Sequence, residues 1–172
     1  MTRKTRATKA DPPASDLTYV LRTCRADMTA HSGFRWPASG VVKAADWRPT
    51  AECGNGLHGL LMGEGDGSLL SWEPDAIWLV VAVERTALVD LGGKVKFRSG
   101  EVVQCGTREA AVAFLIARGA PADRMIGGQA SATGDGGQAS ATGVRGQASA
   151  TGVRGQASAT GVRGQASATG DG

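Results

Sequence analysis

Residues 128–172 consist of five nine-residue units, which read in order GQASATGDG, GQASATGVR, GQASATGVR, GQASATGVR and GQASATGDG. Within each unit, Gln-Ala-Ser-Ala-Thr alternates alanine with polar residues, which is the period-two pattern of a strand with one buried face. The glycine-rich remainder favours a bend, because glycine adopts positive φ without steric cost. One short strand and one bend per unit predict a β-solenoid over 128–172 with alanine inside.

The number of units in one coil is less certain from the sequence. Nine extended residues span about 30 Å, which is short for two sheets and two bends. We therefore favour two units, or 18 residues, per coil. Gln129 would then stack on Gln147, whereas a nine-residue coil would stack it on Gln138. The alternative is that this Gly/Ala/Ser-rich segment stays disordered, since alanine buries little apolar area.

The repeat resembles two known kinds of β-structure. Its period is similar to that of the calcium-binding β-rolls of secreted bacterial toxins, and its Ala-x-Ala-x-Gly texture to the head repeats of trimeric adhesins. The toxin rolls need an Asp in every turn, and the three central units carry Val-Arg instead, so we expect no calcium. Arg145, Arg154 and Arg163 would form a surface ladder, for which solvation is the simplest role. An open solenoid edge favours pairing with a second copy.

The rest of the chain divides into three segments by composition. Residues 1–15 are basic and polar and predict a disordered arm. Residues 16–120 contain every Trp, Phe and Tyr and predict an α+β domain, followed by a linker over 121–127. The apolar run 76–83 predicts a strand covered on both faces. Thr107 as N-cap and Gly119 after the last turn predict a helix between them.

Several shorter strands are expected around these two elements. Residues 17–21 read as the first strand, and 34–47 as short strands about a turn. Residues 86–91, 94–98 and 101–105 are further strands, separated by Gly92-Gly93 and Ser99-Gly100, the dipeptides typical of hairpins. Six glycines within residues 53–67 predict a long irregular loop there.

The 53–67 loop also holds the candidate chemistry. Cys53, Gly54, Gly56, Leu57 and His58 form a Cys-Gly-x-Gly-Leu-His element. Together with Gly33-Phe34-Arg35-Trp36-Pro37, Asp46-Trp47 and Lys94-Val95-Lys96-Phe97, this element makes residues 17–118 resemble an uncharacterised domain family found in phages and their bacterial hosts. The resemblance implies no established activity. Cys53 and His58 are weak catalytic candidates, because no orienting acid is evident.

Two alternatives for this loop remain open. Gly54-Asn55-Gly56-Leu57 is similar to the Gly-x-Gly-aliphatic turn beside the NAD site of ADP-ribosyltransferases, although no catalytic Glu is clearly placed. A structural turn explains the same residues. Cys24, His31 and Cys105 could join the loop in a zinc site, but the spacing fits no standard module, so we expect neither metal nor cofactor.

The charge and hydropathy of the sequence limit the classes of partner that the protein is expected to bind. The net charge is +3, but it resides in the arm and the repeat, which argues against a dedicated nucleic-acid surface. The sequence contains no apolar run long enough for a membrane span and no secretory leader, so we expect a cytoplasmic protein. A non-enzymatic structural or interaction protein is the leading hypothesis, with the ADP-ribosyltransferase-like enzyme as the alternative.

Overall fold

A computed structural model describes residues 16–30, 32–122, 125, 129–133, 138–142, 147–151, 156–160 and 164–169. The predicted arm over 1–15 lies outside the described residues. The protein is mostly β-sheet with one helix, α1 (Arg108–Ile116), among these residues. A larger sheet contains β1 (Leu17–Cys24), β2 (Gly40–Lys43), β3 (Leu57–Leu61), β4 (Ile77–Glu84), β5 (Val89–Asp90), β6 (Val95–Phe97) and β7 (Ser99–Gly106). Short 3₁₀ turns occur at η1 (Gly67–Leu69) and η2 (Arg85–Ala87).

The seven strands run in the order β2-β7-β4-β1-β3-β6-β5, and every neighbouring pair is antiparallel. The central pair β1 and β4 is in register over its full length, from Leu17 opposite Glu84 to Cys24 opposite Ile77. The apolar run predicted as the strongest strand is therefore the centre of the sheet.

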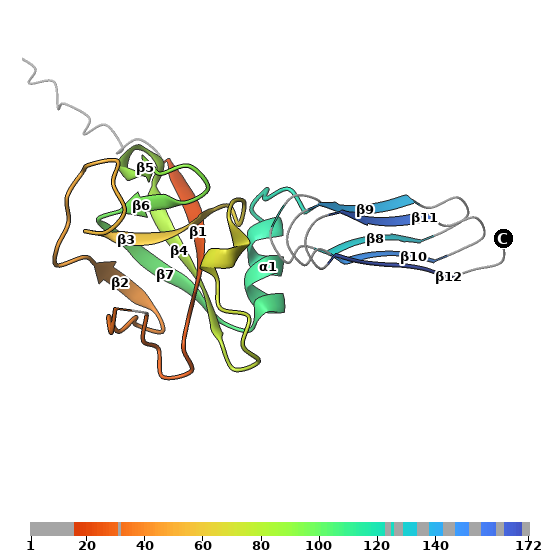
Figure 1. Ribbon diagram of the computed structural model, residues 1–172, viewed down its shortest axis with the longest axis horizontal. Coiled ribbons are helices and arrows are strands. Elements are labelled where there is room, and N and C mark those ends of the chain that lie inside the picture. Colours follow the sequence, from red (N-terminus) through yellow and green to blue (C-terminus); the bar gives the residue numbers. More distant parts are fainter. Residues whose placement is uncertain are drawn as a thin grey trace, which may run out of the picture.

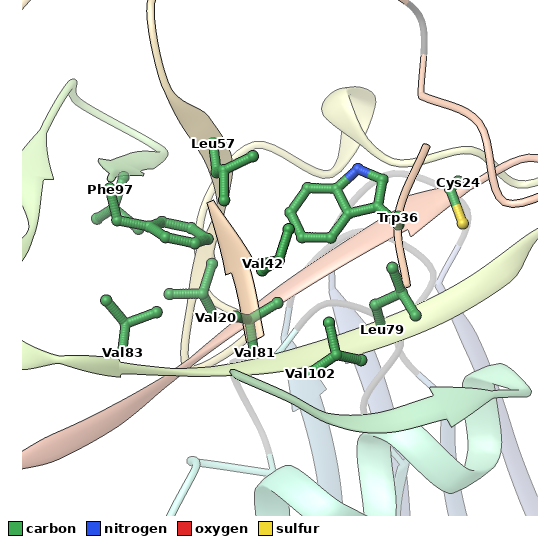
Figure 2. Packing of buried hydrophobic residues seen from close by; sticks show 11 residues of the cluster. Val20, Cys24, Trp36, Val42, Leu57, Leu79, Val81, Val83, Phe97 and Val102 are labelled. Atoms are coloured by element: carbon green, nitrogen blue, oxygen red, sulfur yellow. The ribbon is translucent and has the colours of Figure 1, made fainter. Parts of the chain in front are cut away.

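Hydrophobic side chains cover both faces of β4, as predicted. On one face, Val81 and Val83 pack with Val42 of β2 and Phe97 of β6 (Figure 2). Because β2 is at one end of the sheet and β6 near the other, the sheet curls around this cluster. On the opposite face, Val80 and its neighbours pack against α1.

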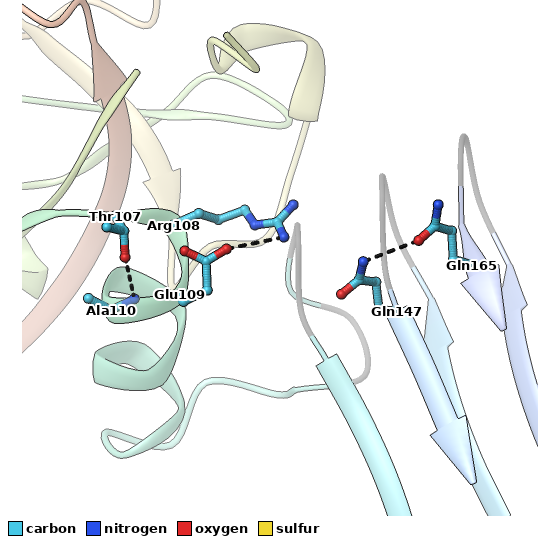
Figure 3. A network of polar contacts seen from close by, with 6 residues as sticks. All are labelled: Thr107, Arg108, Glu109, Ala110, Gln147 and Gln165. Carbon is cyan, nitrogen blue, oxygen red and sulfur yellow. Dashed lines mark hydrogen bonds and ion pairs between the residues drawn. The ribbon is translucent and has the colours of Figure 1, made fainter. Parts of the chain in front are cut away.

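Helix α1 begins and ends where the sequence predicts. The Thr107 hydroxyl accepts a hydrogen bond from the Ala110 amide at 3.3 Å, which caps the helix N-terminus (Figure 3). At the other end Gly119 has φ +87°, and the Ala120 amide donates to the Leu115 carbonyl at 3.0 Å. This is a Schellman motif, which only a left-handed residue such as glycine closes without strain.

The prediction of an irregular loop over residues 53–67 is wrong for residues 57–61. Residues 57–61 form strand β3, which pairs with β1 and β6. A Cβ at Gly59 would lie 2.5 Å from Val20 Cγ1 and 2.6 Å from the Leu21 carbonyl oxygen. Glycine is therefore used here to bring two strands close together, not to break the chain.

Two further turn predictions have different outcomes. Gly92-Gly93 joins the antiparallel strands β5 and β6, as expected of a hairpin. Ser99-Gly100 is not a turn: it begins β7, and β6 and β7 are separated by β1, β3 and β4 in the sheet. Gly100 lies where a Cβ would be 2.7 Å from the Ala82 carbonyl oxygen, so close strand packing again explains the glycine. Within 34–47, only Gly40–Lys43 is a strand.

The repeats contain strands β8 (Gln129–Thr133), β9 (Gln138–Thr142), β10 (Gln147–Thr151), β11 (Gln156–Thr160) and β12 (Gln165–Thr169). They form two parallel sheets, β8-β10-β12 and β9-β11. Gln147 pairs with Gln129 on one side and with Gln165 on the other. The paired residues are thus 18 positions apart, the interval favoured from the sequence.

Alanines of β10 and β11 face one another. Ala148 and Ala150 are 3% and 0% exposed and contact Ala157 and Ala159 of the second sheet. The stacked strands lie on the far side of α1 from the seven-stranded sheet (Figure 1). Met125, within the segment expected to be a linker, is fully buried in the cluster beneath α1. No helix in the described part of the chain is long and apolar enough to cross a membrane.

Candidate functional site

The turn that leads into β3 requires its glycines. Gly54, Asn55 and Gly56 all have positive φ, at 93°, 50° and 151°. A Cβ at Gly56 would lie 2.9 Å from both the Lys96 Cγ and the Trp47 ring. The Gly-x-Gly pattern is therefore explained by close packing within the protein itself.

Lys96 stabilises this turn through hydrogen bonds to its backbone. Its side chain is fully buried, and its Nζ donates to the carbonyl oxygens of Glu52 at 2.8 Å and Gly54 at 3.3 Å. The ammonium also lies 5.7 Å from the centre of the Trp47 ring. Two backbone carbonyls thus stabilise a buried cation.

A cavity of about 540 Å³ opens beside this turn. This volume is within the usual range for small-molecule sites, about 300–1,000 Å³. Strands β1 and β3, the 30–36 loop, the 53–54 turn, η1 and Lys94 enclose it. Its lining combines apolar with cationic side chains: Arg22, Thr23, Ala30, Ser32, Phe34, Trp36, Cys53, Gly54, Leu57, His58, Gly59, Leu60, Leu69, Leu70 and Lys94.

Arg22 is the most unusual residue of this lining. Its guanidinium lies 4.1 Å from the centre of the Trp36 ring and donates to the backbone carbonyls of His58 at 3.2 Å and Thr23 at 3.3 and 3.4 Å. Burial lowers the pKa of Arg22 to about 10. A partly buried cation in a cavity, held by an aromatic ring and carbonyl oxygens and with a perturbed pKa, is a candidate for a ligand-binding residue.

Cys53 and Lys94 lie at the exposed side of the cavity. The Lys94 Nζ is 3.1 Å from the Cys53 sulfur, and this hydrogen bond and charge lower the pKa of the exposed thiol. Burial, followed by the charges of Lys94, Lys96 and Arg22, lowers the pKa of His58. His58 is therefore neutral near pH 7.

Two polar atoms in the lining are buried without a hydrogen-bond partner among the described residues. They are the Nε1 of Trp36 and the Nε2 of His58. Trp36 is only 2% exposed, and its indole nitrogen is on the side of the ring away from Val81 and Val102 (Figure 2). Unpaired buried polar atoms carry a desolvation cost, so two of them at one cavity call for a partner that the described residues do not supply.

Most of the residues singled out in the sequence meet at this cavity. Cys53, Gly54, Leu57 and His58 line it, whereas Asn55 and Gly56 do not. Cys24 instead lies in the core with Cys105 packed against it, and all three cysteines are free. His31, Arg145, Arg154 and Arg163 are outside the described residues.

Sequence reasoning did not identify Arg22, Trp36 or Lys94 as site residues. The one signal for Arg22 was a lone cation inside the apolar strand Leu17–Cys24. The cavity's described lining contains no carboxylate, so it offers no acid for ADP-ribosyl transfer. Within the described ranges, no three His, Cys, Asp or Glu side chains lie close enough together to hold a metal ion.

Together these features define a mostly β protein with a cationic cavity in its globular part and stacked nonamer strands beside it. Residues 18–113 match a family described as a domain of unknown function, DUF7666. The chain belongs to this family. The match confirms the predicted resemblance to an uncharacterised domain family.

Curated relatives carry a more informative name. An ice nucleation protein of Pseudomonas syringae is 44% identical over 105 residues, which are 60% of this chain and 9% of that protein. One of Pseudomonas fluorescens is 42% identical over 103 residues, 59% of this chain and 8% of the relative. Ice nucleation protein InaU of Pantoea ananas is 38% identical over 103 residues, 59% of this chain and 10% of the relative.

The chain therefore spans about a tenth of the length of the curated relatives it matches. No solved structure matches it.

Proposed function

We propose that this chain is a non-enzymatic structural protein related to ice nucleation, whose repeats form a β-solenoid that self-associates and orders water. The observation that carries the proposal is the in-register parallel pairing of repeat strands 18 residues apart. Identical residues then stack into rows, so the surface repeats regularly along the stack.

The exposed rows suit the ordering of water. Ser149 and Thr151 point outward from β10, opposite the buried alanines. In-register pairing places Thr169 beside Thr151 at the usual strand spacing of about 4.7–4.9 Å. The Gln147 Nε2 also donates to Gln165 Oε1 at 3.2 Å, which fixes one row of the surface (Figure 3). The name of the relatives is the reason to propose ice, and not another ordered surface, as the target of these rows.

Self-association is proposed from the exposed alanines of β12. Among the described residues, three strands form the β8-β10-β12 sheet and two form the facing β9-β11 sheet. Ala166 and Ala168 of β12 are consequently exposed, although Ala148 and Ala150 of β10 are buried. A strand from a second copy would cover the two exposed alanines and continue the ladder.

Changing the number of repeats tests this directly. Deleting residues 164–172 removes β12 with its exposed Ala166 and Ala168 and leaves two described strands in each sheet. Deleting 155–172 leaves an odd number of strands and exposes alanines again, so it is the matched control. Burying two methyl groups contributes about 1.6 kcal/mol at about 0.8 each, and the single-unit deletion should weaken association by about tenfold.

Sedimentation velocity over a concentration series measures this association. The proposal of self-association fails if the intact protein is a monomer at every concentration, or if both deletions have equal effects.

A droplet-freezing assay tests the water-ordering part separately. The intact protein should raise the median freezing temperature above that of buffer, and Thr151→Lys with Thr169→Lys should lower it again. Thr50→Lys, on an exposed loop of the globular part, is the matched control and should have no effect. Freezing at the buffer temperature by an associated protein would exclude the ice proposal alone.

A further inference from the structure

We propose that the cavity between β1, β3 and the 30–36 loop is a binding site for a small organic anion, with a carboxylate or phosphate head and an apolar body. This inference is independent of the repeats and of their proposed function. It rests on unpaired hydrogen-bond donors, two cations with no Asp or Glu in the described lining, and apolar walls, which meet in one half-open cavity.

The first argument is the hydrogen-bond balance of Arg22. A guanidinium has five N–H donors in a fixed fork, and its bonds to the Thr23 and His58 carbonyls use three of them. The two that remain have no partner among the described residues. A carboxylate or phosphate accepts such pairs in a bidentate manner, which makes it the ligand group that best matches this geometry.

The second argument is the Trp36 indole. Its Nε1–H is a donor only, it is buried in a side chain that is 2% exposed, and it has no partner in the part of the chain that the structure describes. The Trp36 ring lies under the Arg22 guanidinium at 4.1 Å. One anionic oxygen beside both groups would satisfy an arginine N–H and the indole N–H together.

The third argument is charge. Lys94 lies at the exposed side of the same cavity, and the described lining has no Asp or Glu to balance Arg22 and Lys94. Cations that line a concave cavity with apolar walls raise the local concentration of anions and strengthen their hydrogen bonds. A neutral His58, whose buried Nε2 is unpartnered within the described ranges, adds a group that can gain a proton when an anion binds.

The apolar walls define the rest of the ligand. Phe34 packs edge-to-face on Trp36, with ring centres 5.5 Å apart. Leu57, Leu60 and Leu70 complete a surface that would bind an aliphatic or aromatic body better than water. Inorganic phosphate alone would leave these side chains uncovered.

Isothermal titration calorimetry on the full chain tests the site with four probes. Phenyl phosphate and benzoate combine an anionic head with an apolar body, benzyl alcohol lacks the charge, and inorganic phosphate lacks the body. We expect one-to-one binding of at least one of the first two, at least about tenfold tighter than either control probe. Which of the two binds identifies the head group.

Two variants avoid the risk that loss of Arg22 prevents folding. Trp36→Phe keeps an aromatic ring and removes the indole N–H, and Lys94→Gln removes a charge from the exposed side. Each should weaken binding several-fold, and Lys94→Gln about tenfold because a charge-assisted bond is lost. Arg25→Gln, an exposed position next to β1, is the control and should bind as the wild type does.

Three results would overturn the proposal. The first is that neither phenyl phosphate nor benzoate binds, and the second is that benzyl alcohol binds as tightly as they do. The third is that Trp36→Phe and Lys94→Gln both bind with unchanged affinity while circular dichroism shows each to be folded. Equal binding of inorganic phosphate would refute the apolar part of the site.

Discussion

Replacing Gly59 by alanine would put a methyl group between two paired strands. The new Cβ would lie 2.5 Å from Val20 Cγ1 and 2.6 Å from the Leu21 carbonyl oxygen. Carbon atoms in proteins pack at about 3.5–4.0 Å, so β3 would have to move away by about 1 Å. Such a movement opposes the pairing of Leu21 with Leu60 that joins β3 to the centre of the sheet.

The cost can be built from two contributions. Overpacking of a well-filled site costs about 1–3 kcal/mol, and weakening one or two backbone hydrogen bonds adds about 1 kcal/mol. The free energy of unfolding should therefore fall by about 2–4 kcal/mol, a large part of the roughly 5–15 kcal/mol typical of a domain. Because β3 carries His58, the same change should also disturb the cavity.

Urea denaturation followed by tryptophan fluorescence measures this loss. All four tryptophans lie within residues 16–120, so the signal reports the globular part alone. Gly33→Ala is the control, because Gly33 has φ +79° and a Cβ added there would meet no atom within 4 Å. Gly33→Ala therefore introduces backbone strain without a steric clash, and it should lower the free energy of unfolding by about 1–2 kcal/mol. A smaller loss in Gly59→Ala than in Gly33→Ala would refute the steric reasoning.

Three more outcomes are expected. Ala150→Leu should overfill the space between the repeat sheets and reduce the β-signal in circular dichroism, whereas Ser149→Leu on the exposed face should not. The rate of Cys53 alkylation by iodoacetamide should reach half its maximum below the thiol's ordinary pKa of 9.0, and Lys94→Met should raise this midpoint, because Lys94 lowers the pKa of Cys53. In the folded protein the pKa of His58 is below its ordinary 6.5, so just below pH 6.5 the unfolded chain binds more protons than the folded chain. The urea concentration at half-unfolding should therefore fall as the pH drops through this range. The fall should be smaller in His58→Phe.

The sequence correctly predicted the elements that are determined by interactions between residues close together in the chain. The β4 run, the α1 caps and the Gly92-Gly93 hairpin each follow from side chains a few residues apart, and the structure agrees with the sequence there. The wrong predictions concern glycines that are set by distant neighbours. Gly59 and Gly100 are glycine because another strand approaches them, and a single sequence cannot distinguish that from a turn.

The cavity was only partly predictable for the same reason. Cys53 and His58 attracted notice because they are close in sequence and chemically reactive. Arg22 and Lys94 are separated from them by tens of residues and meet them only because β1 pairs with β3 and β3 with β6. Trp36 reads as an ordinary core residue, and its Nε1, unpaired among the described residues, becomes visible only with the side chains in place.

Met125 limits how far the repeats can move relative to the globular part. Its side chain is fully buried, and a Cβ on Gly63 would lie 2.5 Å from its Cγ, so the core is shaped around it. Strand β8 begins at Gln129, four residues later in the chain, and four extended residues reach at most about 14 Å. The stacked strands are therefore held close to α1, as Figure 1 shows. If repeats of two copies pair, their globular parts must come together too, so the anion cavities would be arrayed at an interval set by the repeat stack.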